Sequence, residues 1–200
     1  MKIFKLCFAA LLVSTASVCC AQNADSAPQS STQNPEDGWF RRNVDAAEDK
    51  VESLYDNGRL SMILSGYAYH DRRTYNTAHL DKINEKAWGI GMDKEMRDAK
   101  DNEESIQFLV IADSHNEPQI SASYNYYWMK PVTADWEAGA GYSAGMVSRT
   151  DIFKGIPIPA ILPTFSVGTR DVKLLATFVP HLSGTVNGNV LFFALRFNLK

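Results

Sequence analysis

Aspartate and serine follow one another at Asp113 and Ser114, directly after the apolar run FLVIA. With a histidine between them, an acid and a hydroxyl form the relay in which the histidine removes the hydroxyl proton. Adjacency in sequence makes that geometry awkward, because neighbouring strand residues point to opposite faces. The two residues therefore lie where a strand breaks into a loop, and an ordinary turn stabilised by the Asp or Ser side chain is the alternative.

The histidine that the topology could bring to this pair is His70, which ends the segment GYAYH. If 59–70 and 105–112 are the first and third strands of an up-and-down barrel, they run in the same direction. Their C-terminal ends then share one rim, which we expect to be extracellular. His70 is thus a candidate general base beside Asp113 and Ser114, and a solvated loop histidine is the alternative.

The elements that must position these residues are strands, because side chains after residue 58 alternate between apolar and small or polar. In one segment Ile120, Tyr124 and Trp128 share a face. Most of the expected strands reach the ~9–11 residues of a tilted membrane strand. Eight are expected, at 59–70, 86–96, 105–112, 118–130, 134–147, 157–169, 171–180 and 188–199.

The polar face of these strands contains few Lys and Glu residues, and aromatic residues gather near the strand ends. The predicted fold is therefore all-β, an eight-stranded antiparallel transmembrane β-barrel with an N-terminal amphipathic α-helix. A water-soluble barrel such as a lipocalin, with its apolar face inside, is the alternative. A barrel of this size has room for side chains or one small ligand, which argues against a general porin.

The chain before the barrel has three parts. Residues 1–21 read as a signal peptide, with Lys2 and Lys5 before a short apolar stretch and small residues up to Ala21. Residues 22–36 read as a disordered linker. Residues 37–55 have the spacing of an amphipathic helix, which either packs on a protein core or lies in the membrane interface. Residues 37–200 are predicted to form one domain that consists of this helix and the β-barrel.

Composition excludes several classes of function. All three cysteines lie in the predicted leader, so the mature chain has no disulfide and no thiolate metal site. The net charge of −3 argues against nucleic acid, whose binding depends on neutralised phosphates. We expect no metal and no cofactor.

Prolines interrupt two of the expected strands. Residues 156–163 read IPIPAILP, and Pro180 ends the next strand. Proline has no N–H for a sheet ladder, so Pro163 and Pro180 predict a stretch without backbone pairing. A bulge or an early strand end is one interpretation. The other is a lateral gap through which a lipid chain enters from the bilayer.

These motifs, in this order, resemble the PagP family of outer-membrane lipid A palmitoyltransferases. The resemblance covers residues 39–199. It includes the segment Tyr67–His70, Asn84-Glu85 with Trp88-Gly89, Asp113-Ser114, the proline-spaced strand 156–168, Pro180 and 187–190. It implies an outer-membrane acyltransferase that moves a palmitoyl or similar chain from the sn-1 position of a phospholipid to a hydroxyl of lipid A. The implied partners are these lipids, and the protein is expected to be a monomer.

The resemblance also implies roles for individual residues. His70, Asp113 and Ser114 match the family's catalytic residues, and Pro163 and Pro180 match the prolines that flank its lateral lipid gap. Ser123 aligns with a glycine at the floor of the family's acyl pocket, so we expect palmitate or a slightly shorter chain. Ala87 replaces a proline that marks a second gap. Two other functions stay open: a non-enzymatic adhesin or envelope-stabilising barrel, and an acyl-chain carrier.

Overall fold

The computed structural model describes residues 35–73, 84–112, 117–149, 155–181 and 189–199. The predicted signal peptide, most of the predicted linker, and both Asp113 and Ser114 lie outside these ranges. A helix, α2 (Pro35–Asn57), begins two residues before its expected start. In the described residues no helix is both long and apolar enough to cross a bilayer. The chain divides into two units, residues 1–53 and 54–200, and the strands belong to the second.

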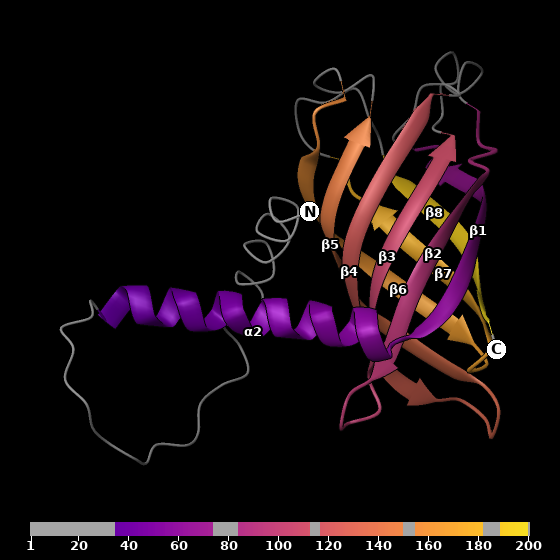
Figure 1. The fold of residues 1–200 in the computed structure, drawn as a ribbon. Helices are drawn as coiled ribbons and strands as arrows, with labels where there is room; N and C mark the ends of the chain where they lie inside the picture. Colours follow the sequence, from indigo (N-terminus) through magenta and orange to yellow (C-terminus); the bar gives the residue numbers. More distant parts are fainter. Residues whose placement is uncertain (1–34, 74–83, 113–116, 150–154, 182–188, 200) are drawn as a thin grey trace. The chain divides into compact units, whose positions relative to one another are not determined.

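Eight antiparallel strands form a closed barrel in chain order, with β8 paired to β1 (Figure 1). Each strand begins and ends within about three residues of its predicted bounds, and the fold prediction is confirmed. The strands are β1 (Arg59–His70), β2 (Gly89–Arg97), β3 (Glu103–Ala112), β4 (Pro118–Pro131), β5 (Glu137–Arg149), β6 (Ile158–Gly168), β7 (Val172–Val179) and β8 (Val190–Asn198).

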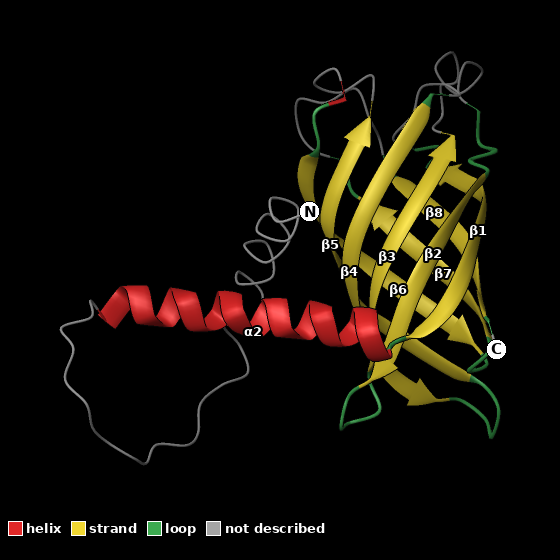
Figure 2. Ribbon diagram, in the orientation of Figure 1, coloured by secondary structure: helices red, strands yellow, loops and turns green. Residues whose placement is uncertain are grey.

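The apolar face of the strands lies outside, as a membrane barrel requires and a lipocalin does not allow. Along β3 and β4, Phe108 and Trp128 are exposed by 50% and 55%, whereas Ser105 and Asn125 on the other face are buried. The two ends of the barrel differ in their connections (Figure 2). At the end where β1 finishes, residues 71–88, 113–117, 150–157 and 180–189 connect the strands; at the other end, only 98–102, 132–136 and 169–171 do so. Longer connections are typical of the extracellular side.

The interior near the short turns is filled by paired charges. The Glu103 carboxylate is fully buried and accepts hydrogen bonds from Lys173 and Arg196, the latter at 2.5 Å. Arg196 Nη2 also lies 2.6 Å from Glu95 Oε2, and Lys173 Nζ lies 2.5 Å from Glu137 Oε1. Such charges are tolerated in a barrel interior because each has oppositely charged partners. They fill the half of the barrel that lies farther from His70.

Candidate active site

His70 faces the barrel interior because of a β-bulge in β1. Pairing between β1 and β8 passes from Ser65↔Ala194 to Tyr67↔Phe193, so Gly66 is an extra residue. Ser65 is buried, Gly66 and Tyr67 are exposed, and burial then resumes at Ala68 and His70. Strict alternation from Ser65 would have turned His70 toward the lipid. The bulge reverses that parity and leaves His70 only 3% exposed.

The carboxylate of Glu85 contacts His70 from the segment that leads into β2. Glu85 Oε1 accepts the His70 backbone N–H at 3.2 Å and lies 3.5 Å from His70 Nδ1. Arg72 donates two hydrogen bonds to the same carboxylate, at 2.7 and 2.9 Å, and Tyr67 donates a further one at 3.3 Å. The rim of the barrel therefore has a fixed anion beside its buried histidine.

Glu85 is ionised under all ordinary conditions. The two hydrogen bonds from Arg72 are the main reason, and with the His70 backbone N–H they lower the pKa of Glu85 to about 2, against a smaller opposing effect of desolvation. A carboxylate with that pKa accepts hydrogen bonds at neutral pH and does not donate them. Its neighbour His70 therefore faces a full negative charge.

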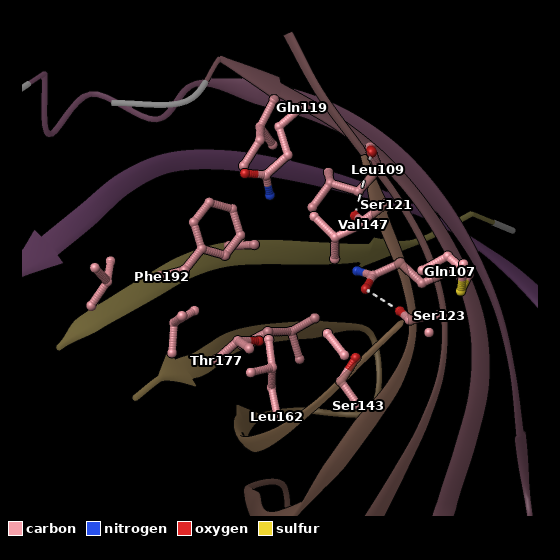
Figure 3. Close-up of a pocket in the computed structure, with 18 of the residues that line it drawn as sticks. Gln107, Leu109, Gln119, Ser121, Ser123, Ser143, Val147, Leu162, Thr177 and Phe192 are labelled. Atoms are coloured by element: carbon pink, nitrogen blue, oxygen red, sulfur yellow. Dashed lines mark hydrogen bonds between the residues drawn. The ribbon is translucent and has the colours of Figure 1, made fainter. Parts of the chain in front are cut away.

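A cavity of about 180 Å³ extends from this rim into the barrel. His70 and Gln119 line its outer part, and Figure 3 shows Phe192 and Leu162 on its walls. Its lining is mainly apolar, as a lipid chain requires. The apolar lining residues include Leu109, Ile111, Val147, Leu162, Leu175, Val179, Val190, Phe192 and Ala194.

Polar side chains also line the cavity deeper in the barrel, where Tyr127 and Leu175 line it as well. Ser123 donates to Gln107 Oε1 at 3.3 Å (Figure 3) and to Asn125 Oδ1 at 3.4 Å. Asn125 in turn donates to Ser105 Oγ at 3.2 Å. Ser123 lies about 16 Å along β4 from the rim residue Pro118, at a rise of about 3.3 Å per residue. The expected inward direction of Ser123 agrees with its burial, since it is only 8% exposed.

Backbone pairing between β6 and β7 covers only the half of these strands that is farther from His70. The paired register runs from Thr164↔Thr177 to Gly168↔Lys173 in the described residues. Beyond Thr164, the register pairs Ile158 to Pro163 with β5. Phe178 and Val179 likewise pair with β8. Pro163 and Pro180 thus border an unpaired stretch beside the cavity.

Pairing between β1 and β2 also ends early, at Ser65↔Gly89. Beyond it, Ala68 N–H donates to the Glu85 carbonyl at 2.9 Å, and Ser65 Oγ donates to the Ala87 carbonyl at 2.7 Å. Ala87 N–H also donates to the Glu85 carbonyl at 3.0 Å, a bond that a proline at this position could not make. Ala87 therefore adds a backbone hydrogen bond where the resemblance implies a proline.

Of the three predicted catalytic residues, the structure describes His70 alone. Asp113 and Ser114 directly follow Ala112, whose N–H donates to the Trp88 carbonyl at 2.9 Å. The segment 84–88 therefore contacts both the end of β1 and the end of β3. In the described residues no group of three or more His, Cys, Asp or Glu side chains could hold a metal.

Glu85 is the residue that sequence reasoning missed. In the sequence Asn84-Glu85 is only a part of the family motif, and nothing in its spacing predicts a contact with His70. Its contact with His70 depends on the bulge at Gly66 and on pairing that connects β1 to residues 84–88. An isolated glycine within a predicted strand was the available signal, because such a glycine often marks a bulge.

Fold and site together define a small transmembrane β-barrel that holds an apolar cavity beside a buried histidine. A family model described as "Antimicrobial peptide resistance and lipid A acylation protein PagP" matches residues 50–196. The chain therefore belongs to the PagP family, as its motifs suggested.

Curated relatives support the same assignment. A protein named Lipid A acyltransferase PagP from Bordetella pertussis (strain Tohama I) is 35% identical over 156 residues, which cover 78% of this chain and 84% of that protein. A protein of the same name from Legionella pneumophila (strain Philadelphia 1) is 32% identical over 190 residues, 94% of this chain and 98% of that protein. The crystal structure of Neisserial surface protein A matches 70% of this chain and 95% of that chain with a TM-score of 0.38 and 12% identity, a likeness too weak to add to the assignment.

Proposed function

We propose that this PagP-family protein is an outer-membrane acyltransferase that moves a palmitoyl or similar chain from the sn-1 position of a phospholipid to a hydroxyl of lipid A. The observation that carries the proposal is the mainly apolar cavity, which is lined by the buried His70 at the rim and by Ser123 and Gln107 deeper in the barrel. One acyl chain can occupy such a cavity with its ester end near the histidine. Relatives that share most of the chain are named for this class of reaction.

The donor chain enters through the unpaired stretch between β6 and β7. Pro163 and Pro180 border that stretch, and a lipid tail can pass there without breaking backbone hydrogen bonds. The terminal methyl then reaches toward Ser123 and Gln107. The early end of β1–β2 pairing supports a second opening, for the acceptor, although the bond from Ala68 to Glu85 crosses it.

His70 acts as the general base in this proposal, and the reaction takes place at the extracellular rim. Its imidazole takes the proton of the acceptor hydroxyl while that oxygen attacks the donor ester carbonyl. Asp113 and Ser114 orient the reacting groups or stabilise the oxyanion. The sn-1 oxygen leaves with the proton that His70 received, so a lysophospholipid and an acylated lipid A result. The closed barrel has no sheet edge to pair with a second copy, which supports a monomer.

The test is expression in a bacterium that lacks its own enzyme of this kind, followed by mass spectrometry of lipid A. Wild type should add one acyl mass, and His70→Ala and Ser114→Ala should each abolish the addition. Heat-modifiable gel mobility confirms that each variant has formed a barrel. If the protein were an acyl carrier or an adhesin, lipid A would gain no mass even though the wild-type barrel is correctly inserted. That outcome would contradict the proposal.

A further inference from the structure

We propose that Glu85 is a positioning residue for His70: its carboxylate holds the proton on Nδ1, so that Nε2 is the basic atom that meets the acceptor hydroxyl. The inference rests on the proposed function, in which His70 is the general base. Glu85 then has the role of the acid that orients a catalytic histidine. In the sequence, Asp113 was the candidate for that role.

The contacts of Glu85 converge on His70. Its Oε1 atom meets two groups of that residue, the backbone N–H at 3.2 Å and the Nδ1 atom at 3.5 Å. A third contact is indirect, because Arg72 Nη1 donates to the His70 carbonyl at 3.3 Å and to Glu85 Oε1 at 2.7 Å. The carboxylate thus contacts both the backbone and the ring of one residue, which restricts the ring's rotation.

Arg72 fixes the carboxylate in turn. Both guanidinium nitrogens of Arg72 donate to it, one to each oxygen, in the fork geometry that makes such pairs directional. The guanidinium carbon also lies 5.5 Å from the centre of the Tyr69 ring. A carboxylate held in this way stays aligned during the reaction, as a positioning residue requires.

The charge of Glu85 decides which nitrogen of His70 holds the proton. The contact between Oε1 and Nδ1 is an ion-pair distance of 3.5 Å, and the negative charge at that distance favours the Nδ1–H form of the ring. Nε2 is then the base. When Nε2 takes the hydroxyl proton, the ring becomes a cation at a site only 3% exposed to solvent, and the carboxylate stabilises that cation.

The complete step is balanced. The acceptor O–H bond breaks and its proton moves to Nε2, while the oxygen bonds to the donor carbonyl carbon. The bond from that carbon to the sn-1 oxygen then breaks, and the leaving oxygen takes the proton from Nε2. Glu85 neither gains nor loses a proton, since its pKa of about 2 is far below neutral pH.

The test variant is Glu85→Gln, which keeps the shape of the side chain and removes its charge. Arg72 Nη1 and the His70 backbone N–H both donate to Oε1, so the amide oxygen of Gln takes that place and the NH₂ group takes the place of Oε2. The amide oxygen still accepts from Nδ1–H, but the imidazolium that forms when Nε2 takes the hydroxyl proton loses its anionic partner. We expect kcat to fall by about 10²–10⁴-fold, with a much smaller change in KM.

Two measurements separate this role from simple anchoring of the segment 84–88. The first is the ¹⁵N chemical shifts of the His70 ring in detergent micelles, which should show the Nδ1–H form in wild type and a larger fraction of the Nε2–H form in Glu85→Leu, which has no acceptor for Nδ1–H. The second is a matched control, Asp101→Asn, which breaks an exposed pair with Arg170 (3.1 Å) at the opposite end of the barrel. This control should leave both the ring shifts and kcat unchanged.

Each outcome is decisive. An unchanged tautomer in Glu85→Leu, or a kcat of Glu85→Gln within about threefold of wild type, overturns the role of Glu85. Loss of activity in His70→Ala together with an active Glu85→Gln overturns this inference alone and leaves the proposed function standing. Full activity in His70→Ala overturns the proposed function itself.

Discussion

Ser123, which we expect at the floor of the acyl pocket, lines the cavity and is hydrogen-bonded to Gln107. A methyl group pushed past it would separate Ser123 from Gln107 and leave buried polar atoms without partners, which is unfavourable. A floor at this position would limit the acyl chain both by volume and by polarity. Gly145 pairs with Ser123 across β4 and β5, and a Cβ added to Gly145 would lie 2.7 Å from that of Ser123.

Ser123→Leu should shorten the acyl chain that is transferred. The larger side chain occupies space now available to the end of the chain, and each buried CH₂ contributes about 0.8 kcal/mol, or about a fourfold preference. Mass spectrometry of lipid A should show a product two or more carbons shorter than that of wild type. An unchanged product would mean that the chain does not reach Ser123.

The contact between Glu85 and Arg72 makes stability depend on pH. The carboxyl has a folded pKa of about 2, below the ~4.3 of an unfolded chain, so its ionised form stabilises the folded state. That contribution is complete above about pH 5 and is lost as the pH falls through the folded pKa. The melting temperature of wild type should therefore exceed that of Glu85→Gln at pH 7, and the difference should shrink between pH 4 and pH 2. Circular dichroism in micelles measures it, and a constant difference would contradict the assignment.

At the scale of elements, the bulge in β1 decides whether His70 meets substrate or lipid. Gly66 is the extra residue, and no pair of the β1–β8 register includes it. Deleting Gly66 leaves every observed pair in place and keeps Ala68 and His70 on the inner face. Deleting Ala68 also removes one residue, but it reverses the faces of Tyr69 and His70.

The two deletions therefore form a matched pair. We expect the barrel to form in both cases, since the lower register from Arg59 to Ser65 is untouched. Acyl transfer should persist when Gly66 is deleted and disappear when Ala68 is deleted. Lipid A analysis with heat-modifiable mobility tests this; equal activities would show that the direction of His70 does not depend on the bulge.

The bulge is a feature that the alternation of residues within one strand does not predict. Alternation along each strand is a local property, and it predicted the strands, the outward apolar face and the inward direction of Ser123. The bulge and the contact between His70 and Glu85 depend on which residues pair across neighbouring strands. That pairing is non-local, and a single strand such as RLSMILSGYAYH does not reveal it. The ion pairs of Glu103 and Arg196 likewise join residues of four different strands, so no single strand reveals them.

At the scale of the molecule, the buried charges near the short turns stabilise the closed barrel. Glu103→Ala removes a buried carboxylate that pairs with both Lys173 and Arg196. Removal of one partner from a buried ion pair lowers the free energy of unfolding by about 3–5 kcal/mol. The exposed pair of Asp101 and Arg170 should contribute about 0–1 kcal/mol. Urea unfolding in micelles should therefore show a large loss of unfolding free energy for Glu103→Ala and almost none for Asp101→Asn. Equal losses would mean that the buried charges are not paired as described.

The same charges bear on permeability. An outer-membrane protein with a cavity large enough for a lipid chain could compromise the permeability barrier of the membrane. If the cavity extended through the whole barrel, antibiotics and other solutes could pass into the cell. Here the cavity is lined as far as Tyr127 and Leu175, and paired charges occupy the interior nearer the short turns. Because those charges and their neighbours fill a narrow barrel, we expect it to hold a lipid chain without opening a path for solutes.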